Sequence, residues 1–268
     1  MNKNIIFEQI TLKILNQLKD GVLPWRKSWK VGIPQNYITR RRYNGINWLS
    51  LLLNEYGSPY YLTFLQCKEL GQYVNQGEKG SLIVFFKLTD FGSNAEELKM
   101  VPLLRYSYSF NVMQTTIKIE QVRSTIISCE ELISKFKVTP VIKNNIGRAY
   151  YRIDEDYISL PSIGDFNTPE EYYSTLFHEA IHFTGAFKRL NRDMGKDTHI
   201  LEELVAELGA SYLCGLCGIS QSVIENQSAY INGWLKKCTD DKNLIIKASI
   251  EARKAVDFLL GVNDRNTE

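Results

Sequence analysis

The sequence predicts an α+β protein of two domains, an N-terminal mixed α/β domain and a C-terminal, mostly helical domain with a small sheet. Strand-like alternation stops at residue 160, whereas helical periodicity runs from residue 168 to the end. The charge divides in the same way. Residues 1–120 carry 15 Lys and Arg against 9 Asp and Glu, and residues 121–268 carry 17 against 21. We therefore expect domains at 1–125 and 126–268, which suits a chain of 268 residues.

The composition excludes several classes of protein. Apolar residues make up 44% of the chain and charged residues 23%, so it is neither disordered nor collagen-like. Five cysteines are an odd number and form no disulfide framework. The chain has no run of 18 apolar residues, and its N-terminus lacks the pattern of a signal peptide. We expect a soluble cytoplasmic protein that does not enter a membrane.

The N-terminal half alternates between helical and strand-like segments. Apolar residues at helical spacing predict a helix over 6–18, ended by Asp20 and Gly21. A second helix or buried segment is expected over 46–53. Thr63 is typical of an N-cap, and it predicts a short helix over 65–70. Residues 81–87 and 103–111 read as two strands joined by an exposed loop.

The C-terminal half is mainly helical. A helix is expected from Ser128, and residues 149–160 read as a pair of strands. Thr168 followed by Pro169 and Glu171 combines an N-cap, a proline at the first helical position and an acidic residue at the third. The predicted helices cover residues 168–185, 200–217, 220–236 and 241–260.

The predicted helix over 168–185 carries the most specific motif, His178-Glu179-Ala180-Ile181-His182. In this H-E-x-x-H pattern the two histidines lie one turn apart on one helix face, so both can bind one ion. Glu179 is then placed to act as a general base toward water. The chain has three histidines, and two of them are here. We predict a metal site with His178 and His182 as ligands.

A site of this kind needs a third protein ligand. Glu203 and Glu207 lie four residues apart among apolar residues of the next predicted helix. Buried carboxylates are costly unless they bind a cation or a partner. We favour Glu203 as the ligand and Glu207 as support for a histidine, while the reverse assignment stays open. His199 is a competing ligand, although we expect it in a solvated loop.

Cations and aromatic side chains are interleaved in the basic half. This mixture suits single-stranded nucleic acid, because phosphates pair with Lys and Arg while bases stack on rings. Arg40-Arg41-Arg42 is the densest cation cluster. For Trp25 and Trp29 the alternative is packing onto the core, since exposed tryptophan is unusual.

These features together resemble the ArdC-type antirestriction proteins of conjugative plasmids and related mobile elements. In the N-terminal half the resemblance rests on 21–29 (GVLPWRKSW), 34–47 (PQNYITRRRYNGIN), 61–80 (YLTFLQCKELGQYVNQGEKG) and 110–114 (FNVMQ). In the C-terminal half it rests on 172–185, 189–193 (RLNRD), 202–213 and 227–235 (QSAYINGWL).

The resemblance implies an N-terminal domain that binds single-stranded DNA and is shared with TraC-type plasmid primases, and a C-terminal zincin-like metallopeptidase domain. It implies protection of incoming DNA from host restriction, and Zn²⁺ as the metal, with Mn²⁺ or another divalent ion as alternatives. Expected partners are single-stranded DNA, with double-stranded DNA and a host restriction enzyme or other protein substrate as further candidates. The implied DNA surface comprises Trp25, Lys27, Arg40, Arg42, Tyr43, Asn47, Gln66 and Lys79.

Two alternative functions stay open at the level of sequence. The chain could be a DNA-binding protein without turnover, in which the metal only stabilises the fold. A role as a primase accessory is the weaker alternative, because no nucleotidyl-transfer motif is visible.

Overall fold

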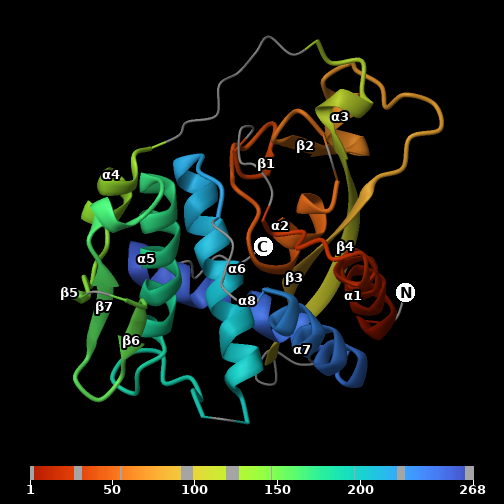
Figure 1. The fold of residues 1–268 in the computed structure, drawn as a ribbon. Coiled ribbons are helices and arrows are strands. Elements are labelled where there is room, and N and C mark those ends of the chain that lie inside the picture. Colours follow the sequence, from red (N-terminus) through yellow and green to blue (C-terminus); the bar gives the residue numbers. More distant parts are fainter. Residues whose placement is uncertain are drawn as a thin grey trace.

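We describe a computed structural model of the chain, which covers residues 3–26, 32–54, 56–91, 99–118, 127–145, 147–195, 197–221 and 227–262. Figure 1 shows two sheets at opposite sides of a group of helices. The predicted α+β class and its division into two domains are confirmed. The predicted boundary between residues 125 and 126 lies outside the described residues.

The N-terminal domain is built on a four-stranded sheet in the order β1-β2-β4-β3, with β1 parallel to β2 and the other pairs antiparallel. The side chain of Thr63 accepts a hydrogen bond from the Gln66 backbone N–H, which starts the short helix α3 as predicted. The elements are α1 (Lys3–Lys19), β1 (Gln35–Asn36), α2 (Gly45–Leu52), β2 (Tyr60–Thr63), α3 (Phe64–Glu69), β3 (Ser81–Phe91), β4 (Lys99–Asn111) and the 3₁₀ helix η1 (Val112–Gln114).

The C-terminal domain places a three-stranded sheet, β5-β7-β6, on the outer side of helix α5 (Figure 1). Thr168 caps α5 through the Glu171 backbone N–H, and Pro169 occupies the first turn, as predicted. The elements are α4 (Cys129–Ser134), β5 (Val141–Asn145), β6 (Tyr150–Arg152), β7 (Tyr157–Pro161), η2 (Ile163–Asp165), α5 (Pro169–Thr184), α6 (His199–Cys217), α7 (Gln227–Asp240) and α8 (Leu244–Leu260).

Both domains contribute to one hydrophobic core. Trp25 and Trp48 of the N-terminal domain are both buried. They belong to the same cluster as Phe177, Leu208 and Ile245 of the C-terminal domain. Helix α2 packs on α8, and α1 packs on α7 and α8. The domains are therefore joined by a shared apolar interior, which the charge division alone did not predict.

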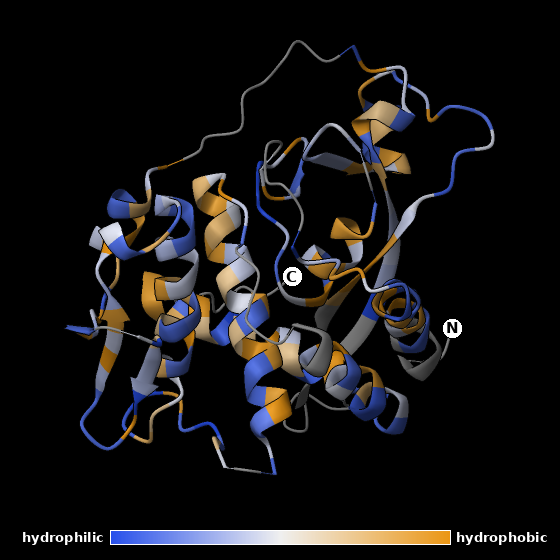
Figure 2. Cartoon of the chain, viewed as in Figure 1, coloured by the Kyte–Doolittle hydropathy of each residue, from blue (hydrophilic) through white to orange (hydrophobic). Residues whose placement is uncertain are grey.

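Helix α6 runs through the centre of this arrangement and contacts α4, α5, α7 and α8. Its first turns mix hydrophilic and hydrophobic residues, and its later turns are mostly hydrophobic (Figure 2). Glu202, Glu203 and Glu207 lie in these first turns near the histidines of α5, so this is where the sequence-predicted carboxylates and histidines meet.

Candidate metal centre

Helix α5 presents the two histidines of the H-E-x-x-H motif on one face. The Nε2 atoms of His178 and His182 lie 3.1 Å apart, and their rings meet edge to face with centroids 4.8 Å apart. The two side chains are only 15% and 11% exposed. Both Nε2 atoms therefore point at one small, largely buried volume.

Glu203, from the second turn of α6, completes this cluster. Its carboxylate oxygens lie 3.6 Å from His178 Nε2 and 3.5 Å from His182 Nε2. Within the described residues, His178, His182 and Glu203 are the group whose donor atoms converge, all within 4.8 Å. Two imidazoles and one carboxylate are a donor set that suits a divalent transition metal. The structure thus places Glu203 with the histidines, where the sequence analysis expected the third ligand.

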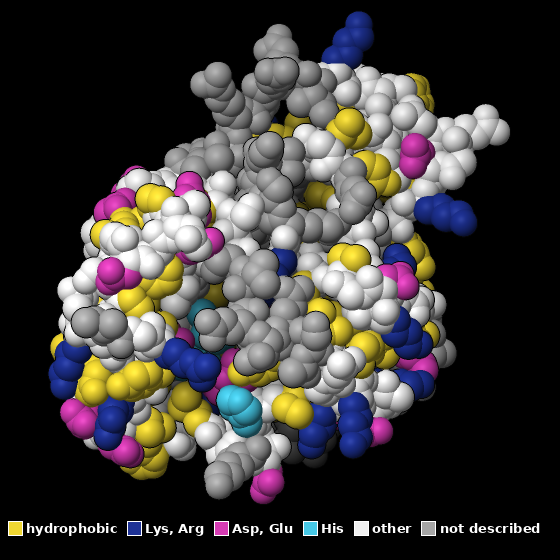
Figure 3. All heavy atoms as spheres, in the orientation of Figure 1, with side chains coloured by type: hydrophobic (Ala, Val, Ile, Leu, Met, Phe, Trp, Pro, Cys, Tyr) yellow, Lys and Arg dark blue, Asp and Glu magenta, His cyan; other side chains and the backbone are white. Residues whose placement is uncertain are grey.

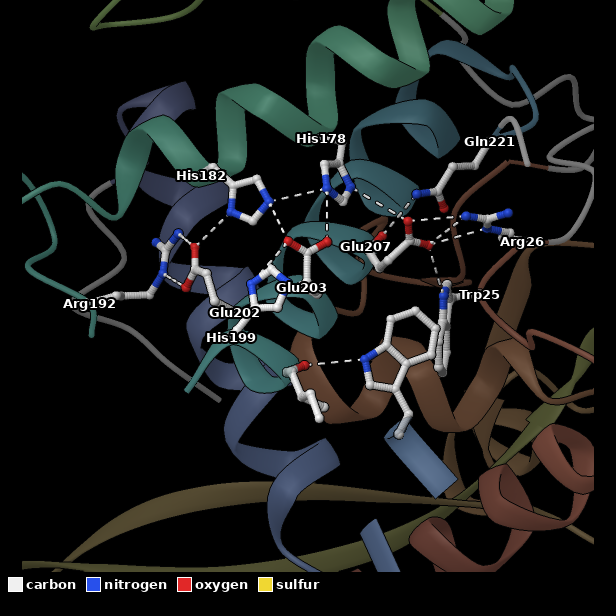
Figure 4. Close-up of polar contacts among 12 residues, drawn as sticks. Trp25, Arg26, His178, His182, Arg192, His199, Glu202, Glu203, Glu207 and Gln221 are labelled. Atoms are coloured by element: carbon white, nitrogen blue, oxygen red, sulfur yellow. Dashed lines mark hydrogen bonds and ion pairs between the residues drawn. The ribbon is translucent and has the colours of Figure 1, made fainter. Parts of the chain in front are cut away.

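The other ring nitrogen of each histidine faces a second carboxylate. His182 Nδ1 lies 3.1 Å from Glu202 Oε1, and His178 Nδ1 lies 3.5 Å from Glu207 Oε1 (Figure 4). A carboxylate at Nδ1 fixes the ring orientation and leaves Nε2 free to bind metal. Glu207 therefore lies beside His178, at the position that the favoured assignment requires.

Sequence reasoning missed Glu202. Glu202 lies in the first turn of α6, where an acidic residue is usually exposed to solvent. In the fold it is 4% exposed, and Arg192 holds it at 2.7 and 2.9 Å from two guanidinium nitrogens. No local pattern in the sequence signals this contact, because Arg192 approaches from the connection between α5 and α6.

The cluster carries an excess of negative charge. Glu179, Glu202, Glu203 and Glu207 contribute four negative charges, and Arg192 and Arg26, which pairs with Glu207, contribute two positive charges. With neutral histidines the sum is −2, which is the charge that one divalent cation would cancel.

The same electrostatics appears in the pKa values of the metal-free cluster. Burial lowers the pKa of His182, but its hydrogen bonds with Glu202 and Glu203 outweigh burial and raise that pKa to about 9. Burial raises the pKa of Glu203, but hydrogen bonds with His178 and His182 hold it well below its ordinary value. The site therefore favours a positive charge between Glu203 and the two rings.

An open cavity of about 560 Å³ leads to this cluster, and its wall includes Arg148, Tyr151 and Tyr230. Glu179 lines the cavity and is 8% exposed. Burial and the charges of Glu203, Glu207 and Glu179 raise the pKa of Tyr230, so its hydroxyl lies in the field of these carboxylates. Figure 3 shows histidine and acidic side chains next to one another on this face of the molecule.

The expectation that His199 lies in a loop is wrong. His199 is the first residue of α6, and its Nδ1 lies 3.6 Å from Glu203 Oε1. Its side chain is 56% exposed, unlike those of His178 and His182. The group of converging donors in the described part of the chain does not include it.

The structure corrects several of the expected DNA contacts. Trp25 is completely buried, so it cannot stack on a base. Tyr43 is 8% exposed, and its hydroxyl lies 3.4 Å from Ser109 Oγ. The side-chain amide of Asn47 bonds the backbone N–H and C=O of Val84. These three side chains are used by the fold: Trp25 packs in the core, and Tyr43 and Asn47 join α2 and its preceding loop to strands β4 and β3.

Of the other expected DNA contacts, some are occupied within the fold and others are exposed. Gln66 caps α3 and accepts a bond from Asn36 Nδ2, so its amide oxygen is also occupied. Lys27 lies outside the described residues. Arg40, Arg42 and Lys79 are exposed, as a phosphate-binding role requires.

Several other aromatic residues of the basic half are buried. Trp48, Tyr60 and Tyr61 are each less than 5% exposed. Tyr106 and Tyr108 of β4 are instead 41% and 47% exposed, with ring centroids 6.3 Å apart. Their spacing of two residues in a strand was the available signal, because alternate residues share a face of the sheet.

The fold and the cluster define a class of protein: an N-terminal α/β domain packed on a zincin-like domain that can hold a divalent metal. Two family models agree with this division. Residues 4–110 match the N-terminal domain of the anti-restriction factor ArdC, and residues 128–251 match a zincin-like metallopeptidase domain.

Solved structures extend the match over nearly the whole chain. The crystal structure of the metal-free antirestriction ArdC protein from plasmid R388 is 34% identical, with a TM-score of 0.81, over 94% of this chain and 96% of that one. Its Mn(II)-bound structure is 33% identical, with a TM-score of 0.78, over 97% and 99%. The chain belongs to the ArdC family of antirestriction proteins.

A longer relative is also similar. DNA primase TraC of Escherichia coli is 28% identical over 99% of this chain. The match covers 28% of that primase, so this chain spans about a quarter of the relative's length. No helix in the described part of the chain is long and apolar enough to cross a membrane.

Proposed function

We propose that this protein binds single-stranded DNA through its N-terminal domain, holds one divalent metal ion through its C-terminal domain, and thereby protects incoming DNA from host restriction. The observation that carries the metal part is the convergence of His178, His182 and Glu203 beside Glu179 at the end of an open cavity. The ArdC-type N-terminal domain and the similarity to TraC support the DNA part.

The arrangement of residues supports metal-assisted hydrolysis of a peptide bond. His178, His182 and Glu203 would hold the ion, which supplies Lewis acidity when bound. Glu179 lies in the same cavity, and its carboxylate would accept a proton from the attacking water. Glu202 and Glu207 would keep the two rings oriented. We expect Zn²⁺, with Mn²⁺ as the alternative because the R388 protein has a Mn(II)-bound structure.

The variant Glu179→Gln tests this role, since it removes the base and leaves the three ligands in place. We expect it to retain the fold and the metal content, and to lose hydrolysis of fluorescent casein. His178→Ala serves as the comparison, because it should lose both metal and hydrolysis. Hydrolysis at the wild-type rate by Glu179→Gln would contradict the role of general base.

A second candidate function is DNA binding without turnover. It is favoured by the position of the cluster between α5 and α6, where an ion would tie two core helices together. Antirestriction activity that survives both Glu179→Gln and His178→Ala, but is lost when Arg40 and Arg42 are changed to Ala, would support this candidate. Loss of antirestriction in Glu179→Gln alone would support the catalytic one.

For the DNA surface we propose the exposed cations Arg40, Arg42 and Lys79 together with the pair Tyr106 and Tyr108. Lys79 precedes Gly80, which packs so closely against Tyr108 that an added Cβ would lie 2.8 Å from the tyrosine Cβ. The backbone next to Lys79 therefore passes close to Tyr108. This combination suits a single strand, whose phosphates bind cations while its bases stack on the rings.

Salt dependence separates the two kinds of contact. Changing Arg40 and Arg42 to Ala should lower the affinity for oligo(dT) and reduce the slope of log K against log salt by about 1.4, since each phosphate contact on a single strand contributes about 0.7. Changing Tyr106 and Tyr108 to Ala should lower the affinity with the slope unchanged. Lys135→Ala, a surface change directly after α4, is the control. Unchanged binding in both double variants would place the DNA surface elsewhere.

A further inference from the structure

A segment of the N-terminal domain reaches the support of the metal cluster. Trp25 Nε1 lies 3.4 Å from Glu207 Oε2, and the hydroxyl of Ser211 on α6 donates to the backbone carbonyl of Trp25. The indole also meets the ring of Trp234 edge to face, with centroids 5.6 Å apart. These contacts fix the backbone of residues 25 and 26 against the middle of α6 (Figure 4).

Arg26 continues this contact with a charged group. Its Nε lies 3.2 Å from Glu207 Oε2, and its Nη2 lies 3.1 Å from Oε1 and 3.2 Å from Oε2. The side chains of Arg26 and Glu207 are 7% and 0% exposed. Such a forked contact fixes the plane of the carboxylate as well as its position.

The fixed carboxylate is the one that faces His178. Glu207 Oε1 lies 3.5 Å from His178 Nδ1, and Gln221 Nε2 lies 3.4 Å from the Glu207 backbone carbonyl. The chain of contacts therefore runs from Arg26 through Glu207 to His178. The other histidine has a matching chain through Glu202 to Arg192, which lies entirely within the C-terminal domain.

We propose that Arg26 is a positioning residue for the metal site, so that metal binding by the zincin-like domain depends on the N-terminal domain. The inference rests on the proposed function only in that a divalent ion binds at His178, His182 and Glu203. Arg26 compensates the buried charge of Glu207 and fixes its carboxylate plane. Glu207 then keeps the His178 ring turned so that Nε2 faces Glu203. This arrangement gives a structural reason for the two domains to share one chain.

The alternative is that Arg26 only stabilises the fold. Removing it leaves a buried carboxylate without its partner, which lowers stability whether or not metal binding is affected. A double-mutant cycle separates the two roles. If Arg26 acts through Glu207, its removal has no further effect on metal affinity once Glu207 has been changed to Gln.

The test measures Zn²⁺ affinity by competition with a chromophoric chelator, and Mn²⁺ affinity by electron paramagnetic resonance, on full-length variants. We expect Glu207→Gln to weaken binding by about 10- to 100-fold and Arg26→Met by about tenfold. The double variant should match Glu207→Gln. Arg26→Lys keeps the charge but loses the fork, so it should bind metal with intermediate affinity, and it remains a test if Arg26→Met does not fold.

The matched control is Arg189→Met. Arg189 is 6% exposed and also pairs with a carboxylate, Asp156, but that carboxylate does not contact a histidine. We expect this variant to melt at a lower temperature and to keep wild-type metal affinity. Wild-type metal affinity in both Arg26 variants, or an additive loss of metal affinity in the double variant, would overturn the positioning role of Arg26. Neither result would contradict the proposed metal site. A wild-type protein that binds neither ion would overturn the proposed metal site itself.

Discussion

Gly209 allows α5 and α6 to approach closely where the metal cluster forms. An added Cβ at this position would lie 2.6 Å from Ile181 Cδ1 and 2.7 Å from Cγ1. Ile181 is completely buried and is branched at Cβ, so it has little freedom to move aside. Carbon atoms pack at about 3.5–4.0 Å, so Gly209→Ala requires the two helices to separate by about 1 Å.

The cost combines two opposing effects. Overpacking a core costs about 1–3 kcal/mol, whereas Ala within a helix is more favourable than Gly by about 1 kcal/mol. We expect a net loss of up to about 2 kcal/mol, and in a chain of 268 residues each kcal/mol lowers the melting temperature by roughly 2–4 °C. Glu203 moves with α6, and metal–ligand distances tolerate only about 0.2 Å. We therefore expect metal affinity to fall by about tenfold, the lower end of what disturbed supports cause.

The assay is thermal unfolding, followed by circular dichroism, together with chelator competition for Zn²⁺. Gly233→Ala in α7 is the matched control, because its Cβ would lie 3.6 Å from Ile200 Cδ1, an ordinary contact. It should be neutral or stabilising by up to about 1 kcal/mol. Adding Ile181→Val to Gly209→Ala should recover part of the loss. A Gly209→Ala variant that is as stable as Gly233→Ala and binds metal normally would show that the close approach of α5 and α6 does not depend on Gly209.

The contacts of His182, Arg192 and Trp25 each lead to a further prediction. Because hydrogen bonds raise the pKa of His182 from 6.5 to about 9 in the metal-free fold, the stability it contributes is fully present below pH 6.5 and is lost as the pH rises through 9. The melting temperature of chelator-treated protein should fall as the pH is raised from 6.5 to about 9, and an unchanged melting temperature would contradict this role of His182. Arg192→Met should weaken Zn²⁺ binding by about tenfold, measured by chelator competition, because it releases Glu202; wild-type affinity would argue against this support. Trp25→Ala should cost about 3–5 kcal/mol in urea unfolding, as expected for a buried tryptophan, and a cost below about 1 kcal/mol would contradict its burial.

Local signals in the sequence were enough for most of the secondary structure. The predicted starts at Thr63, Ser128 and Thr168 are helix caps in the structure, because capping depends on residues three positions apart. Strand β5 was missed, since four of its five residues are exposed and show no alternation. Helix α7 was expected from residue 220, but residues 220 and 221 are not helical, and the described part of this helix covers Gln227–Asp240.

The candidate site also combines features that the sequence predicts with contacts that only the fold reveals. The helical spacing of His178 and His182 and the apolar neighbours of Glu203 are local features, and they predicted the cluster that the structure brings together. The contacts of Arg26 and Glu202 are long-range or arise from a connecting loop, so no sequence pattern carried them. Aromatic residues could be counted in the basic half, but only the fold shows that Tyr106 and Tyr108 are exposed while Trp25 is buried.

The metal content of purified full-length protein is the most direct test of the metal site. We expect about one divalent ion per chain by mass spectrometry after dialysis, retained in Glu179→Gln and lost in Glu203→Ala. Loss of the ion in Glu179→Gln, or a full complement in Glu203→Ala, would contradict the assignment of His178, His182 and Glu203 as the metal site.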